Sequence, residues 1–104
     1  MMFQKCKITV VKRMVNDDLV NEYATEPKKF PICDIVKDGQ EFVVTNPFVM
    51  PEGLCPWAWA DIRMFIVTMA SGGSFPGMKN ADTAVATCTD PFRPVIFKIE
   101  KVSE

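Results

Sequence analysis

Apolar and polar residues alternate along the first part of this chain. Between residues 3 and 13, the apolar side chains of Cys6, Ile8 and Val10 fall on one side of an extended chain, with polar side chains between them. A period of two is typical of a strand that is buried on one face. Similar stretches, bounded by turn residues, predict three further strands at 40–45, 83–89 and 95–102.

The longest apolar stretch has the length of a helix and clear signals at both ends. Pro56 suits the first helical position, because its missing N–H is not needed there. Gly72-Gly73 can adopt the left-handed backbone that ends a helix. We therefore expect a helix over about 56–70. Apolar residues occur on all its sides and its only charges are Asp61 and Arg63, which favours a helix enclosed by the fold.

A shorter helix is expected at about 17–24. Asn16 or Asp17 can cap its first turn, and Pro27 closes it. The order strand, helix, strand, helix, strand, strand indicates one α+β domain over residues 1–104. Four or five mostly antiparallel strands, either curled toward a barrel or not, would wrap around or cover the central helix. The alternative is an open sheet with that helix on one face and a second protomer on the other.

The composition indicates apolar surface beyond what one small core can hide. Of the 104 residues, 48% are hydrophobic. A domain of this size buries only about two thirds of the surface of its unfolded chain. A homodimer or an apolar cleft for a small-molecule ligand would account for the remainder. The simpler alternative is a core dense in Met and Phe.

The charge pattern excludes several partners. The net charge is −1 and no basic stripe occurs, which argues against binding to nucleic acid. The longest apolar run is interrupted by Asp61 and Arg63 and is too short to span a bilayer, which argues against a membrane partner. The N-terminus alternates like a strand and lacks the apolar core of a signal peptide. We therefore expect a cytoplasmic protein.

The chain contains no histidine. Catalytic triads, Cys-His pairs and His-ligated zinc are therefore excluded within a single chain. Any general acid or base would have to be a carboxylate, a Lys, a Cys or Tyr23.

The four cysteines, at positions 6, 33, 55 and 88, are the main candidates for chemistry. No two of them form a Cys-x-x-Cys pair, so the usual zinc-ribbon and thioredoxin-like signatures are missing. Cys55 is predicted at the N-cap of the 56–70 helix. Unpaired N–H groups and the helix dipole favour a thiolate there.

Cys33, Cys55 and Cys88 each begin or end an element, so they can meet at one end of the sheet. Three thiolates there could hold zinc, copper(I) or an iron–sulfur cluster with an outside ligand. Two of them could instead form a redox dithiol. The alternative is that these residues, like Cys6, are core thiols, because cysteine is among the most buried residue types.

A second hypothesis is a pocket for a small organic ligand beside Trp57 and Trp59. Asp61 needs a partner on so apolar a helix, and Arg93, Lys37 or a backbone N–H can supply one. In an apolar cleft Asp61 would instead serve as an acid or base. Arg93 is a candidate for binding an anion or stabilising a thiolate. The alternatives for Asp61 are an internal ion pair or a helix-to-loop hydrogen bond. The tryptophans could instead be core or interface anchors, and Arg93 an arginine that pins a loop.

Four separated blocks of the chain carry a resemblance to a family. They lie at 37–42 (KDGQEF), 50–62 (MPEGLCPWAWADI), 88–90 (CTD) and 93–100 (RPVIFKIE). Together they resemble an uncharacterised family of small cysteine-containing proteins of about this length, found mainly in anaerobic bacteria and archaea. The resemblance implies no activity, but it does imply recurring cysteines at Cys33, Cys55 and Cys88, with Cys6 optional.

The chain departs from that family at two of these cysteines. Cys33-Asp34 stands where the family typically has Cys-Pro, and Asp90-Pro91, close to Cys88, stands where it often has Asp-Gly. The loops around both thiols are therefore expected to differ in shape.

Three functional hypotheses follow. The first is a cysteine-centred metal-binding or redox site, accessory to anaerobic metabolism. The second is a binding module without chemistry of its own, either an apolar-ligand pocket or a homodimeric assembly domain. The third, which ranks last, is a small enzyme that uses Asp61 and a thiol.

Overall fold

The computed structural model describes residues 2–103. Its elements follow the chain in this order: β1 (Cys6–Arg13), α1 (Asp17–Tyr23), a 3-10 turn η1 (Pro27–Lys29), β2 (Glu41–Val44), α2 (Pro56–Ala70), β3 (Thr83–Thr87) and β4 (Val95–Lys101). The predicted α+β class, both helices and all four strands are confirmed.

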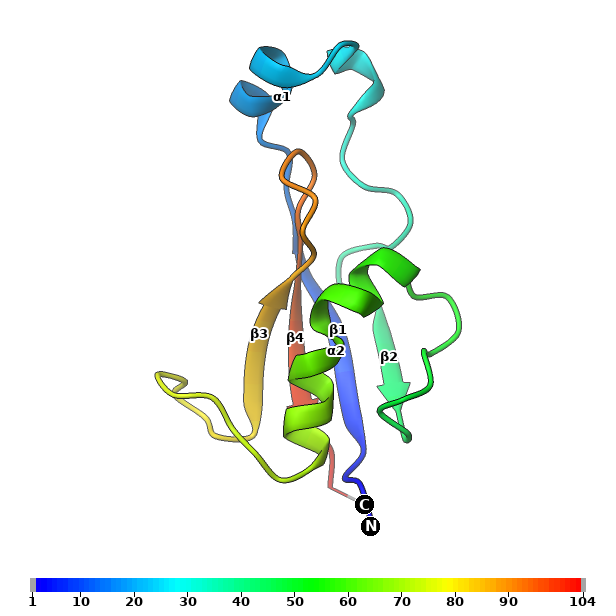
Figure 1. Ribbon diagram of the computed structural model, residues 1–104, viewed down its shortest axis with the longest axis vertical. Coiled ribbons are helices and arrows are strands. Elements are labelled where there is room, and N and C mark those ends of the chain that lie inside the picture. The colour runs from blue at the N-terminus through cyan, green and yellow to red at the C-terminus, as the bar shows by residue number, and fades with distance from the viewer. Residues whose placement is uncertain (1, 104) are drawn as a thin grey trace.

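The strands form one open antiparallel sheet in the order β2-β1-β4-β3 (Figure 1). The sheet is not closed into a barrel, and it covers α2 from one face, which is within the predicted fold class. Strand number accounts for the open sheet, because about eight strands are needed before a closed barrel has room for anything beyond its own side chains. A β-bulge between Val10 and Lys12 interrupts the pairing of β1 with β4.

α2 lies across one face of this sheet, and the core is between them. Inward side chains of β1 and β4 follow the alternation expected from the sequence, as at Ile8 and Phe97. They meet α2 residues such as Ile62 and Ile66, which are fully buried. The opposite side of α2 is uncovered, and Met64 there is 66% exposed. The helix is therefore buried along one side and not enclosed, because the sheet reaches only that side.

The ends of α2 are as the sequence predicts. Cys55 is the N-cap and Pro56 occupies the first turn. At the other end Gly72 has a φ of 94°, and its N–H donates to the Met69 carbonyl at 3.2 Å. The N–H of Gly73 donates to the Thr68 carbonyl at 2.8 Å. This pair of bonds is the Schellman arrangement that glycine favours.

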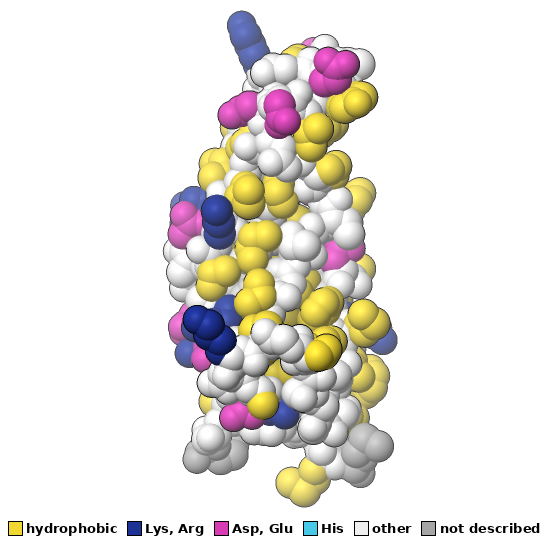
Figure 2. Space-filling model, turned by 90° about the vertical axis from the view of Figure 1, so that its left-hand side faces the viewer, with side chains coloured by type: hydrophobic (Ala, Val, Ile, Leu, Met, Phe, Trp, Pro, Cys, Tyr) yellow, Lys and Arg dark blue, Asp and Glu magenta, His cyan; other side chains and the backbone are white. Residues whose placement is uncertain are grey.

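The second face of the sheet carries charged side chains in a chain of ion pairs. Lys7 lies 3.4 Å from Glu41 and 3.8 Å from Glu100, and Lys98 lies 3.4 Å from Glu100. Figure 2 views the molecule from the side of β3 and shows hydrophobic side chains gathered along its middle, with charged side chains beside them and at the top. Over residues 2–103, no helix combines the length and apolar character needed to cross a membrane.

At the end of the sheet farthest from the chain termini, several connections come together (Figure 1). The backbone beyond β1 bonds to the β3–β4 connection, through Met14 to the Pro94 carbonyl and Asn16 to the Phe92 carbonyl. The connection from η1 to β2 returns along the same end. This meeting of loops is where the candidate site forms.

Candidate ligand pocket

A cavity of about 290 Å³ lies where three connections meet the start of α2. Its wall is made by residues 33–36 before β2, 55–58 at the start of α2, 88–93 between β3 and β4, and Val95 and Phe97 of β4. The volume is close to the lower end of the roughly 300–1,000 Å³ typical of small-molecule sites. Most of the wall is apolar, including Val36, Ala58 and Phe97.

The three cysteines singled out by the sequence all lie on the wall of this cavity. Cys33, Cys55 and Cys88 are half-buried there, whereas Cys6 lies in the core on β1. Each of the three comes from a different connection, as their positions at element ends suggested. All four cysteines are free thiols.

Cys55 has the predicted position at the start of α2. It is the N-cap of α2, and its carbonyl accepts the N–H of Trp59 at 2.9 Å. Its sulfur makes no hydrogen bond to the open N–H groups of the first turn. The side chain is therefore directed to the cavity wall and does not cap the helix.

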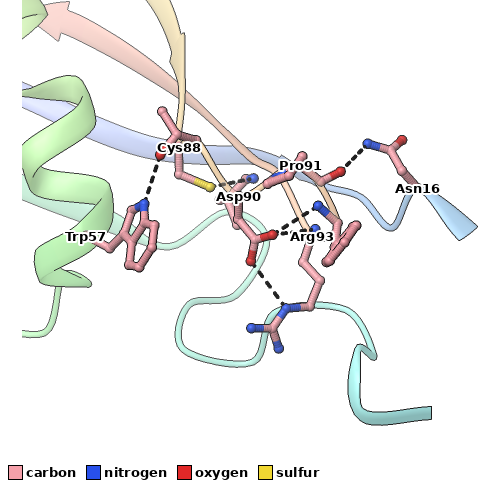
Figure 3. A network of polar contacts seen from close by, with 9 residues as sticks. Asn16, Trp57, Cys88, Asp90, Pro91 and Arg93 are labelled. Carbon is pink, nitrogen blue, oxygen red and sulfur yellow. Dashed lines mark hydrogen bonds and ion pairs between the residues drawn. The ribbon is translucent and has the colours of Figure 1, made fainter. Parts of the chain in front are cut away.

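Cys88 receives the one backbone contact to a sulfur in this site. The N–H of Val95 donates to the Cys88 Sγ at 3.3 Å, and the N–H of Cys88 donates to the Val95 carbonyl at 3.1 Å (Figure 3). These contacts fix the thiol at the mouth of the β3–β4 connection. No sequence signal could reveal them, because they depend on how the two strands are paired.

Cys6 shows what a core thiol looks like in the same protein. It is fully buried in the hydrophobic core, and its Sγ donates to the Gln4 carbonyl at 3.8 Å. Burial raises the pKa of this thiol, and the positive charge of Lys101 partly offsets that effect.

The three pocket thiols share a wall without forming a ready-made ligand set. Within residues 2–103, no three Cys, Asp or Glu side chains are arranged so that they could hold a metal ion. A metal bound by Cys33, Cys55 and Cys88 would therefore require the connections that carry them to move closer together.

The two tryptophans of α2 have different surroundings. Trp57 lines the cavity and is 67% exposed, and its indole N–H donates to the Thr89 hydroxyl at 2.8 Å. Trp59 lies away from the cavity, in a shallow hollow on the outer side of α2 with Arg63 and Met64. Residues two positions apart on a helix lie on nearly opposite sides of it, which explains why the two tryptophans have different surroundings.

Asp61 fastens α2 to the loop after β3. Its Oδ2 accepts the N–H of Thr89 at 2.7 Å and the Thr89 hydroxyl at 3.0 Å. This is the helix-to-loop bond named above as the alternative to an acid–base role, and Asp61 is not part of the cavity wall. Trp57, Thr89 and Asp61 thus form a continuous chain of hydrogen bonds at the rim of the pocket.

Arg93 and Asp90 lie together on the wall (Figure 3). Asp90 accepts the backbone N–H groups of Phe92 and Arg93 and lies 3.4 Å from Arg93 Nε. The guanidinium carbon of Arg93 is 5.4 Å from the centre of the Phe30 ring. Within the described part of the chain, the hydrogen bond of the Arg93 side chain is made by Nε, and no acceptor bonds to its terminal nitrogens.

Sequence reasoning missed two residues of the wall, Ile35 and Val36. They lie in an irregular connection that has neither the period of a strand nor that of a helix. The Val36 carbonyl accepts a hydrogen bond from Arg13, 23 residues earlier in the chain, and a contact between such distant residues leaves no local signal.

Comparisons with protein families, with curated proteins and with solved structures found no match to this chain. The resemblance to the anaerobe family therefore stays a prediction from the sequence.

Proposed function

We propose that this protein is a binding module whose pocket takes a small, mostly apolar molecule bearing a hydrogen-bond acceptor such as a carboxylate. One observation carries the proposal: an apolar cavity of about 290 Å³ lies next to an arginine with unused donors. Ligand sites commonly combine apolar walls with a few polar groups that set orientation. Here the apolar wall would come from Val95, Phe97 and Trp57, and the orienting polar group would be Arg93.

The Asp90–Arg93 pair supports this assignment. Asp90 offsets the charge of the guanidinium and holds its Nε, which leaves the terminal N–H groups as oriented donors. A planar guanidinium can bind a carboxylate through two parallel hydrogen bonds. The ligand's apolar part would then lie along the cavity wall.

Amide NMR shifts on titration with 2-naphthoate test the proposal. We expect shifts at Cys88 and Val95, which belong to the pocket, and none at Lys7 and Val43 on the far face of the sheet. Arg93→Gln should weaken 2-naphthoate about tenfold, as loss of one charged hydrogen-bond partner does. Binding of 2-methylnaphthalene, which lacks the acceptor, should stay the same in both proteins. Shifts confined to the far face, or none at all, would contradict the proposal.

A second candidate function is a cysteine-centred metal-binding or redox site, as the resemblance and the three shared thiols suggest. It is favoured by one observation, the convergence of Cys33, Cys55 and Cys88 on a single cavity from three connections. Thiolates select soft or borderline cations such as copper(I) and zinc. The three connections would close around the ion.

Anoxic equilibrium dialysis with zinc or copper(I), followed by elemental analysis, tests this second candidate. We expect one bound ion per chain, which is lost when Cys33, Cys55 and Cys88 are all replaced by Ser. Cys6→Ala is the matched control and should retain the ion, because Cys6 lies in the core. Binding that survives the triple replacement, or no binding, would contradict this function.

We further propose that the protein is a cytoplasmic homodimer. Exposed large apolar side chains support association, among them Phe48, Val49 and Met64. Four free thiols fit a reducing compartment. Sedimentation analysis should give the mass of two chains, and a monomer at every concentration would contradict the dimer.

A further inference from the structure

The wall of the pocket formed by residues 33–36 belongs to a segment with few hydrogen bonds and little buried surface. Residues 31–36 contain neither helix nor strand. Val36 is the one buried residue among them, and Ile35 is 57% exposed. Arg13 provides the only hydrogen bonds that reach residues 31–36 from the described part of the chain.

Arg13 lies at the end of β1, 20 residues before Cys33 in the chain. Its Nη1 donates to the Cys33 carbonyl at 2.9 Å and to the Val36 carbonyl at 3.1 Å. Its Nε donates to Asp38 Oδ1 at 2.9 Å. The side chain is only 19% exposed, so these bonds are partly shielded from water. One guanidinium thus ties three points of the same connection to the sheet.

We propose that Arg13 is the positioning residue of the pocket: it holds the 33–38 segment against the end of the sheet and so sets where Cys33 and Ile35 lie. The proposal rests on the proposed binding function, because positioning matters only if the cavity is used. Without Arg13, residues 33–36 would keep only the apolar contacts of Val36 and Cys33 with the core. Cys33 and Ile35 would then leave the cavity wall for part of the time.

Arginine suits this role better than lysine does. A guanidinium presents several N–H groups in one rigid plane, whereas a lysine ammonium is a point charge on a flexible stem. The three acceptors around Arg13 are spread over six residues, from Cys33 to Asp38. Asp38 also balances the charge, so the arginine can remain partly buried.

The test combines 2-naphthoate binding with site-resolved alkylation of cysteines in the full chain. For Arg13→Ala we expect the dissociation constant to rise about tenfold, since bonds from a charged donor are lost. Alkylation of Cys33 should accelerate relative to Cys55, while Cys6 stays slow. Arg13→Lys should lie between wild type and Arg13→Ala on both measurements. Arg63→Ala is the matched control, because Arg63 lies on the outer side of α2, and it should match wild type.

The outcomes separate this proposal from the binding function. If wild type binds 2-naphthoate and Arg13→Ala does so equally well with unchanged Cys33 alkylation, the role of Arg13 is overturned and the pocket stands. If wild type does not bind the probe, the binding function fails, yet faster Cys33 alkylation in Arg13→Ala would still support its positioning role. If Arg13→Ala does not fold, Arg13→Lys decides by the same two measurements, and unchanged values there would overturn the proposal.

Discussion

The same residue type occupies two contrasting regions of this protein. Cys6 lies on β1 between the sheet and α2, with no exposed surface. Cys33, Cys55 and Cys88 lie where elements begin or end, half-buried around a cavity. Inside a strand, the alternation of side chains decides whether a cysteine faces the core or solvent. A cysteine at the end of an element is not bound by that alternation and can face a cavity between loops. The difference separates structural thiols from those available to a ligand.

The two regions should respond very differently to loss of apolar volume. Ile62→Ala in the core should lower the free energy of unfolding by about 2–5 kcal/mol, because Ile62 is fully buried and a cavity would remain. Ile35→Ala on the pocket wall should cost less than about 1 kcal/mol, because that side chain is more than half exposed. Urea denaturation measures both values. Equal costs would mean that the pocket wall is as tightly packed as the core.

A smaller effect is expected where the pocket rim is fastened to α2. Thr89→Val removes the hydroxyl that accepts from Trp57 and donates to Asp61, and should cost about 1 kcal/mol in the free energy of unfolding. Thr89→Ser keeps the hydroxyl and is the matched control. Thermal unfolding of the three proteins measures the difference. A Thr89→Val variant as stable as wild type would contradict a contribution of these hydrogen bonds to stability.

The smallest effect concerns the pH dependence of stability. Burial raises the folded-state pKa of Cys6 above its ordinary value of 9.0. Below that pH the thiol is protonated in both states, so its contribution to stability is complete. As the pH rises beyond 9.0, the unfolded chain loses this proton first, and stability falls.

Cys6→Ala should therefore remove part of the alkaline loss of stability. Urea denaturation at a series of pH values up to about two units above the ordinary pKa measures the slopes. Parallel slopes for wild type and Cys6→Ala would contradict a desolvated Cys6.

The elements of this fold could be predicted because each has a local cause. Alternation at Cys6, Ile8 and Val10 gave β1, and Pro56 with Gly72 gave the ends of α2. The enclosure of α2 could not be judged in the same way. The sequence pattern treats an apolar residue such as Met64 in the same way whether it packs against a sheet or faces solvent. The pattern therefore could not show how many sides of α2 are buried.

The pocket could be predicted only in part, for a related reason. The positions of Cys33, Cys55 and Cys88 at element ends suggested one end of the sheet, and all three line the same cavity. The contacts that define the site join residues far apart in the chain, such as Val95 with the Cys88 sulfur and Arg13 with the Cys33 carbonyl. Strand register and loop path decide those contacts, and neither leaves a local signal.

The most direct measurement of the central claim is the alkylation rate of each cysteine with a maleimide, with and without 2-naphthoate. If one apolar pocket lined by three thiols binds the probe, Cys33, Cys55 and Cys88 react faster than Cys6, and the probe slows all three together while Cys6 keeps its rate. Protection of a single cysteine, or of none, would contradict a shared binding pocket.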